Sequence, residues 1–333
     1  MRHEEHDLVA VHAQQRVDEG ARETAEPPVG VEERSPGVDA DSHGTQHATS
    51  SRRWSVVVPT RAGWAHLEST LPSLLAALGA DDEVVIVGDG RAPALAGPAA
   101  FRCRTVIHSG PRGFAPACNR GAAEACGRML LFLNDDVCVS PDLLGVLEGA
   151  LSTPGIGAAG PDIVSDTLGT SESGTSLRWH HGVLEARQDP LSGTGCVEVP
   201  YLCGAAFAMR RRDFVRLGGF DERLAPYYWE DVDLSLRTRE RIGALAVVRG
   251  ATVRHRHGAT IGAEPEAVRR AVYERNRLLV SWRHLRGRRW LNHLAWVPLR
   301  LAAGIVREPA AVAGFAMAVR SAVSGRRADA GRG

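Results

Sequence analysis

The chain has 333 residues, 44% of them hydrophobic, which is enough for a core of one or two domains. Its net charge of +1 hides a polarity, because residues 1–50 hold eleven acids and four arginines whereas 275–333 hold twelve arginines and two acids. All forty basic residues are Arg, and the six cysteines form no CxxC pair, which argues against a disulfide framework or a cysteine metal cluster. Residues 1–52 lack an apolar signal segment and predict a disordered extension in a reducing, cytoplasmic setting.

Strands and helices alternate from Trp54 onward. Apolar runs predict strands over 54–58, 83–87, 104–107 and 129–133, and the apolar spacing predicts helices over 64–78 and through 117–126. This alternation predicts an α/β fold with a mostly parallel, doubly wound sheet flanked by helices. In such a sheet a ligand binds at the carboxyl ends of the strands.

Three polar residues, Asn134, Asp135 and Asp136, directly follow the apolar run 129–133. Carboxylates at the exit of a buried strand favour a divalent cation that bridges phosphate oxygens. The alternative is structural, because these acids could turn the chain and cap the helix that follows Pro141.

The loop from Gly113 to Gly121 contains neither GxGxxG nor GxxxxGK[ST], which excludes the usual dinucleotide and P-loop motifs. Within it, Asn119 offers an amide for a base or ribose edge, and Arg120 offers a guanidinium for phosphate. Taken alone, the pattern favours a plain helix start with a solvent-facing Arg.

A second acidic cluster follows aromatic residues at 227–234. A helix that begins near Glu230 carries Asp231 in its first turn, and the preceding Trp229 suits the C–H face of a sugar while the acid takes a hydroxyl proton. Upstream, Gly204 suggests a close approach by a ligand or another backbone segment. Helix capping and core aromatics explain the same residues equally well.

His255 and His257 stand at alternate positions at the end of a predicted strand, and so on one face if the strand continues. An imidazole can complete the shell of a metal that a carboxylate already holds. A structural role is the alternative.

Taken in order, these stretches resemble the family-2 glycosyltransferases of the GT-A fold, particularly the rhamnosyltransferase-like bacterial branch, over about 54–283. The resemblance rests on 57–60, 113–121, the DxD-like 134–136, 218–222, 229–234 and His255. It departs from the family where Gly88-Asp89 replaces an Asp-Asp or Asp-Asn pair and where Asn134 opens the DxD.

The resemblance implies an inverting transferase, a hexosyltransferase, with Asp231 as catalytic base. Asp136 and His255 would bind Mg²⁺ or Mn²⁺, with His257 a less favoured ligand. Donor contacts would come from Pro59, Thr60, Arg61, Asp89, Asn119, Arg120, Asn134 and Asp135, and acceptor contacts from Gly204, Trp229 and Glu230. The expected partners are a nucleotide-sugar donor and a glycan or lipid-linked acceptor of the cell envelope, and not a nucleic acid.

We expect the catalytic domain over 53–283, with a donor half at 53–140 and an acceptor half at 141–283. Beyond it, apolar stripes predict basic amphipathic helices over 284–325, and we expect a disordered tail over 326–333. Arg300 and Arg307 interrupt every long apolar run, so we expect helices that lie on an anionic membrane surface without crossing it. An ordinary helical cap is the alternative.

Two other functions stay open. A metal-dependent nucleotidyltransferase would use the same sheet and cation, but this Lys-free chain lacks the phosphate-gripping Lys expected of one. A non-catalytic membrane adaptor with the same fold would have no need of both Asp136 and Asp231.

Overall fold

The computed structural model of the chain describes residues 53–61, 64–90, 102–109, 113–166, 169–256 and 264–330. The predicted N-terminal extension and His257 lie outside these ranges. The first half contains β1 (Trp54–Thr60), α2 (Trp64–Ala77), β2 (Glu83–Asp89), β3 (Cys103–His108), α4 (Phe114–Glu124), β4 (Met129–Leu133), β5 (Val137–Val139), α5 (Leu143–Ser152) and β6 (Ile156–Ser165). The second half contains β7 (Thr175–His180), β8 (Val183–Gln188), β9 (Cys196–Glu198), β10 (Ala206–Arg210), α6 (Arg211–Leu217), a 3₁₀ turn (Glu222–Leu224), α7 (Glu230–Arg241), β11 (Ala244–His255), α8 (Glu266–His284), α9 (Arg288–Arg307) and α10 (Pro309–Ala330).

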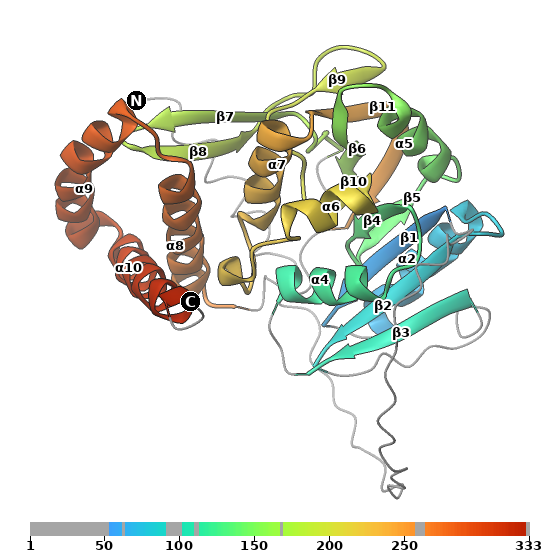
Figure 1. Ribbon diagram of the computed structural model, residues 1–333, viewed down its shortest axis with the longest axis horizontal. Helices are drawn as coiled ribbons and strands as arrows, with labels where there is room; N and C mark the ends of the chain where they lie inside the picture. Colours follow the sequence, from blue (N-terminus) through green and yellow to red (C-terminus); the bar gives the residue numbers. More distant parts are fainter. Residues whose placement is uncertain are drawn as a thin grey trace, which may run out of the picture. The chain divides into compact units, whose positions relative to one another are not determined.

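A nine-stranded sheet in the order β3-β2-β1-β4-β10-β6-β11-β5, with β9 paired to β11, forms the centre of the described fold (Figure 1). β1 pairs in parallel with β2 and β4, β2 with β3, and β6 with β11. β10 lies antiparallel between β4 and β6. β6 and β11 therefore run in the same direction as β1–β4, and six strands place their carboxyl ends at one edge. The mostly parallel α/β sheet predicted from the alternation is confirmed.

Alternate residues of the central strands pack against helices on opposite faces of the sheet, as a pleated strand requires. On one face, Val56, Ile86 and Leu131 pack with leucines of α2 and α5. On the other face, Val57 and Phe132 pack with small residues of α4 and with apolar residues of α6 and α7. Both faces are covered, which is why the strands are apolar throughout.

Close packing of α4 on the sheet depends on a glycine. A Cβ atom on Gly121 would lie 2.4 Å from a methyl carbon of Val57 and 2.9 Å from one of Val87. The neighbouring α4 residues Ala117 and Cys118 are also small and fully buried. This approach brings the start of α4 to the carboxyl edge of β1 and β2.

The C-terminal helices form a group beside the β7–β8 hairpin (Figure 1), where α8 packs on β8 and on α10. α10 continues to Ala330, so the expected tail from 326 lies partly within a helix. Within the described ranges, no helix has the length and apolar character needed to cross a bilayer.

Candidate functional site

The carboxyl edge of the sheet collects polar residues from four strands. Thr60 ends β1, Asp89 ends β2, and Asn134 follows β4 directly. His255 ends β11, whose last residues pair with the start of β5 at Val137. The sheet topology thus brings to one edge residues that lie almost 200 positions apart in the sequence.

An acidic cluster with two imidazoles occupies this edge. His255 Nε2 lies 3.3 Å from Asp136 Oδ1, and His255 Nδ1 lies 3.3 Å from Glu172 Oε2. On the other side, His66 Nδ1 lies 3.4 Å from Asp135 Oδ1. The Asp135 backbone is fixed by the Thr70 hydroxyl, which donates to its carbonyl at 2.6 Å. The cluster therefore consists of two contact groups, His66 with Asp135 and His255 with Asp136 and Glu172. The charges of His66 and Asp136 affect each other across the two groups.

The cluster is electrostatically coupled. Burial by itself lowers the pKa of His255, but hydrogen bonds to Asp136 and Glu172 outweigh it and raise that pKa to about 9. Burial raises the pKa of Asp136, yet the hydrogen bond from His255 brings it below its ordinary value. The hydrogen bond to Asp135 raises the pKa of His66. Without a bound metal ion, His255 is therefore held as an imidazolium that balances carboxylate charge, and it would release that proton on binding a metal.

The donor atoms suit a hard divalent cation in part. Asp136 Oδ1 and His255 Nε2 lie 3.3 Å apart and are the two candidate ligand atoms. Asp135 Oδ2, beside them, is buried without a hydrogen-bond partner among the described residues. Within the same residues, no three His, Cys, Asp or Glu side chains converge on one point as ligands. Mg²⁺ and related ions are often bound by only one or two carboxylates together with substrate phosphates and water, so the pair fits such a site.

Asp231 lies in the first turn of α7, and backbone groups hold its carboxylate. Oδ2 accepts a hydrogen bond from Gly204 N–H at 2.9 Å, and Oδ1 accepts one from Val232 N–H at 2.8 Å. A Cβ on Gly204 would stand 3.4 Å from Oδ2, in van der Waals contact with the carboxylate. The close approach that the sequence suggested at Gly204 is thus made by the Asp231 carboxylate.

The two acidic clusters are joined through one short stretch of backbone. Gly204 contacts Asp231, and the next residue, Ala205, accepts a hydrogen bond from Asn134 N–H at 3.0 Å. The charges of Asp231 and Glu172 both raise the pKa of the Cys203 thiol, after burial, which has the largest effect. Both clusters therefore lie around the 203–205 segment.

Glu230 and Asp231 titrate as a pair. Burial first, and then the Asp231 charge, raise the pKa of Glu230 to about 8. Burial also raises the pKa of Asp231, while hydrogen bonds from Val232 and Gly204 oppose that rise. A pKa of about 8 keeps the buried Glu230 protonated near neutral pH.

The loop before α7 is an unusual backbone segment. Tyr228 and Trp229 both have φ of 74°, in the left-handed region that non-glycine residues rarely adopt. The buried amide of Asn276 stabilises this loop by donating to the carbonyls of Leu224, Tyr227 and Tyr228. Trp229 itself is only 3% exposed, which leaves no open ring face for a sugar.

Three of the expected donor contacts have clear structural roles. Asp89 Oδ2 accepts a hydrogen bond from Gly113 N–H at 3.0 Å and so anchors the start of α4. The Asn119 amide bonds to both backbone groups of Phe220 and to Glu222, which locks the 218–222 turn. Arg120 lies on the outer side of α4 in an ion pair with Glu124 at 2.8 Å. These contacts agree with the structural alternative for Asn119 and Arg120, and their donor contacts stay a prediction.

The first-strand residues behave differently. Pro59 is half-buried and Thr60 buried at the end of β1, while Arg61 is exposed immediately after it. The Arg61 charge slightly opposes the rise that burial causes in the pKa of Tyr227, so Arg61 lies in the neighbourhood of the loop before α7. These residues remain candidates for donor contact.

Two residues of the acidic cluster escaped the sequence reasoning. Glu172 lies in the connection between β6 and β7, where no pattern marks it, and His66 lies on the first helix. The position of His66 was accessible in principle, because a helix that follows a parallel strand begins at the carboxyl edge.

Comparison with known proteins gives a family match over part of the chain and a shared fold. Residues 55–218 match the sequence model of Glycosyl transferase family 2. The chain is 25% identical over 266 residues to the uncharacterized protein y4gI of Sinorhizobium fredii (strain NBRC 101917 / NGR234). That alignment covers 72% of this chain but 28% of the relative, so the chain spans little more than a quarter of that protein.

Two solved structures share the fold. GalNAc-T7, solved with UDP, GalNAc and Mn²⁺, is 19% identical with a TM-score of 0.53, over 69% of this chain and 47% of that one. S. aureus TarS 1–349, solved with UDP-GlcNAc, is 12% identical with a TM-score of 0.54, over 81% of each chain. Both are glycosyltransferases of the GT-A fold, and at these identities the likeness concerns the fold alone.

Proposed function

Because residues 55–218 carry a glycosyltransferase family 2 domain on a GT-A fold, we propose that this protein is an inverting, metal-assisted glycosyltransferase. It moves a sugar from a nucleoside-diphosphate donor to a hydroxyl group of a lipid-linked or envelope-glycan acceptor. The sugar that this protein transfers is a hexose. The rhamnosyltransferase-like branch, which the sequence resembles, is the leading candidate for its place among these enzymes.

The chemistry follows from the placement of the two carboxylate clusters. Asp231 accepts the proton of the acceptor hydroxyl, whose oxygen attacks the anomeric carbon from the side opposite the diphosphate. The bond from the anomeric carbon to the diphosphate oxygen breaks in the same displacement, and its electron pair leaves with the diphosphate. A general base in this position contributes roughly 10²–10⁴-fold to the rate.

Asp136 and His255 would hold the cation, with Asp135 beside them. When bound, the cation supplies Lewis-acid stabilisation of the charge that develops on the leaving diphosphate. Glu172 and His66 orient these residues through the contacts at 3.3 and 3.4 Å described above. Such second contacts commonly set the affinity of a metal site.

The observation that best supports the proposal is the pair of backbone hydrogen bonds to Asp231 from Gly204 and Val232. They hold a half-exposed carboxylate in one orientation next to the segment that contacts Asn134. A residue that only capped the start of a helix would not need the second contact. That contact comes from Gly204, in a different part of the chain.

The test is Asp231→Asn. The donor is first identified by screening nucleotide sugars with Mn²⁺ for thermal stabilisation, and release of nucleoside diphosphate is then measured. The variant should bind that donor as wild type does but lose at least about 10²-fold in turnover. Asp142→Asn, at an exposed position without a side-chain cap bond, is the matched control. A variant that keeps more than about a tenth of the wild-type rate would exclude this role.

Association with an anionic membrane surface is part of the proposal, and the orientation of α9 supports it. One side of α9 faces the protein, where His293 is 3% exposed, accepts a hydrogen bond from Trp282 and donates one to the Gly182 carbonyl. The apolar side faces outward, with Leu291 69% and Ile305 68% exposed.

Helix α9 therefore presents its apolar stripe to the surroundings. Leu294 lies on the same stripe, and the exposed Arg286, Arg288, Arg289 and Trp290 cluster at its first turn. Indole and guanidinium groups beside an apolar helix face are typical of interfacial helices.

Flotation with anionic vesicles at low salt tests this association. Leu294→Ser combined with Ile305→Ser should abolish flotation, whereas Val215→Ser, which removes a 64% exposed apolar side chain from α6, should not. Equal flotation of all three proteins would show that α9 does not contact the membrane.

A further inference from the structure

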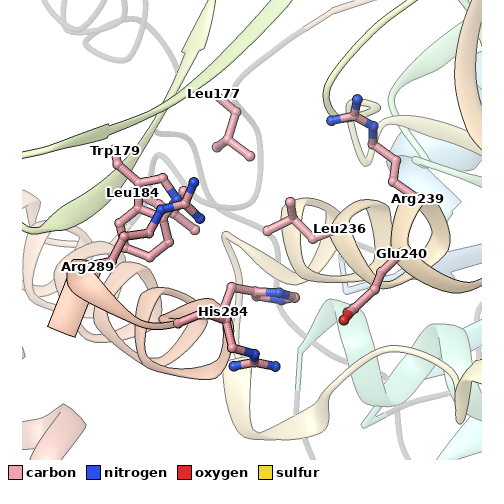
Figure 2. Close-up of a pocket in the computed structure, with 9 residues that line it drawn as sticks. Leu177, Trp179, Leu184, Leu236, Arg239, Glu240, His284 and Arg289 are labelled. Carbon is pink, nitrogen blue, oxygen red and sulfur yellow. The ribbon is translucent and has the colours of Figure 1, made fainter.

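A pocket separate from the acidic clusters lies between the β7–β8 hairpin, the C-terminal half of α7 and the turn from α8 to α9 (Figure 2). We call it the hairpin pocket; its lining is Leu177, Trp179, Leu184, Leu236, Arg239, Glu240, His284, Arg286 and Arg289. Its volume of about 470 Å³ is that of a typical small-ligand site.

One wall of the hairpin pocket is apolar. Leu177 and Trp179 come from β7, Leu184 from β8, and Leu236 from α7. Figure 2 shows Trp179 and Leu184 on the side of the hairpin, with Leu236 across the opening. Apolar walls of this kind accept the C–H surface of a saccharide or a similar organic body.

The rim is cationic, and two of its arginines lack a carboxylate partner among the described residues. The Arg289 guanidinium lies over the Trp179 ring at 4.9 Å from its centre. Arg286 donates only to the backbone carbonyls of Arg283 and Leu285. Stacking on an aromatic ring holds a guanidinium in place without neutralising its charge.

The remaining charged side chains of the rim include Arg239 and Glu240. Arg239 lies 3.5 Å from Glu198, so its charge is offset. Glu240 faces the pocket from α7 beside Arg239 (Figure 2). The pocket is therefore left with the charges of Arg286 and Arg289 against one exposed carboxylate.

An adjoining pocket also favours an anionic ligand. It shares Glu240, His284 and Arg286 with the hairpin pocket and is also lined by Arg237. Arg237 is only 6% exposed, and its Nη2 is buried without a hydrogen-bond partner among the described residues. A buried guanidinium nitrogen with no acceptor is costly, and an anionic oxygen from a ligand would satisfy it.

We infer that the hairpin pocket binds an anionic group, a carboxylate or a phosphate, carried by the acceptor. The inference rests on the proposed function, since it assigns the ligand to the acceptor side. Glu240 follows Asp231 by nine residues on α7, which at 1.5 Å per residue places the pocket about 14 Å from the base. An acceptor would thus lie along α7, with its charged group held far from the reacting hydroxyl.

Binding to full-length protein, measured by calorimetry at low salt without vesicles, tests the inference. The carboxylate probe is oligogalacturonate, with its methyl ester as the neutral match, and the phosphate probe is inorganic pyrophosphate. Replacing Arg286 and Arg289 together by Ser should lower the affinity for whichever probe binds wild type by about tenfold or more. Replacing Arg288 and Arg320 by Ser, two exposed arginines outside the pocket, is the control with the same change in net charge and should cost less than about twofold.

Glu240→Gln supplies a change of opposite sign. Removing the carboxylate that faces the anion should strengthen binding by about two- to fivefold. Loss of oligogalacturonate binding in the pocket variant identifies an acidic sugar as the source of the charge, and loss of pyrophosphate binding alone identifies a phosphate. The inference is overturned if neither anion binds wild type, if the methyl ester binds as tightly, or if the pocket and control variants lose affinity equally.

Nucleotide-sugar binding, measured on the same proteins, separates this inference from the proposed function. Arg286 and Arg289 do not belong to the donor edge, so donor affinity should be the same in wild type and in the pocket variant. If the pocket binds its anion but no nucleotide sugar binds wild type, the proposed transferase activity fails and the anion site stands.

Discussion

Asn276→Ala should destabilise the protein through the loop that positions Asp231. The Asn276 amide nitrogen donates to the carbonyls of Leu224, Tyr227 and Tyr228 at 2.6, 2.9 and 2.8 Å. Asn276 is fully buried, so the variant leaves the three carbonyl oxygens without the donor that they have in the wild type. Two N–H groups at about 0.5–1.5 kcal/mol each, plus the cost of unsatisfied carbonyls, give a loss of about 2–4 kcal/mol.

The same loop holds Tyr228 and Trp229 in left-handed backbone conformations, each costing about 1–3 kcal/mol that the surroundings must offset. Without Asn276 the loop should relax and move the start of α7. Turnover should therefore fall by about tenfold or more, because small displacements of a base are costly.

Urea unfolding monitored by circular dichroism measures the free energy of unfolding, and a constant m-value shows that only stability has changed. Asn292→Ala, at an exposed position on α9, should stay within about 0.5 kcal/mol of wild type. The reasoning is refuted if Asn276→Ala is as stable as that control, since three buried carbonyls cannot lose their donor without cost.

Three further predictions concern the site. Burial and the Asp231 charge raise the pKa of Glu230 from 4.5 to about 8, so the unfolded state releases this proton first as pH rises, and stability falls by a few kcal/mol between about pH 4.5 and 8. Glu230→Gln should abolish that decline in urea unfolding at pH 5 and pH 8, and an unchanged decline would contradict the assignment. Asp136→Ala and His255→Ala should each weaken Mn²⁺ binding in the presence of nucleoside diphosphate by about tenfold or more, and equal affinity in a Mn²⁺ titration would remove that residue from the site. Asn119→Ala should lower the free energy of unfolding by about 1–3 kcal/mol, because it removes the hydrogen bonds that hold the 218–222 turn. Arg120→Ala, which removes an exposed ion pair, should lower it by less than about 1 kcal/mol. Thermal unfolding that ranks the two variants in the reverse order would argue against these roles.

The local pattern of the sequence was sufficient for the four parallel strands β1 to β4. The strand predicted over 129–133 is β4 without change, and the helix predicted to start near Glu230 is α7. Strands buried on both faces are apolar throughout and end abruptly at polar residues, so their limits are visible in the chain itself. The edge at which Asn134 and Asp136 lie followed from the same pattern.

Tertiary structure alone decided which polar residues meet and which side of each helix is covered. Glu172 reaches His255 only because β6 and β11 run side by side, and nothing near Glu172 in the sequence reveals this. Asn119 and Trp229 had the chemistry of ligand contacts, but long-range packing assigned one to a turn and the other to the core. The apolar spacing of α9 gave the width of its stripe, whereas the direction of the stripe was set by the polar contacts of His293 on the opposite side.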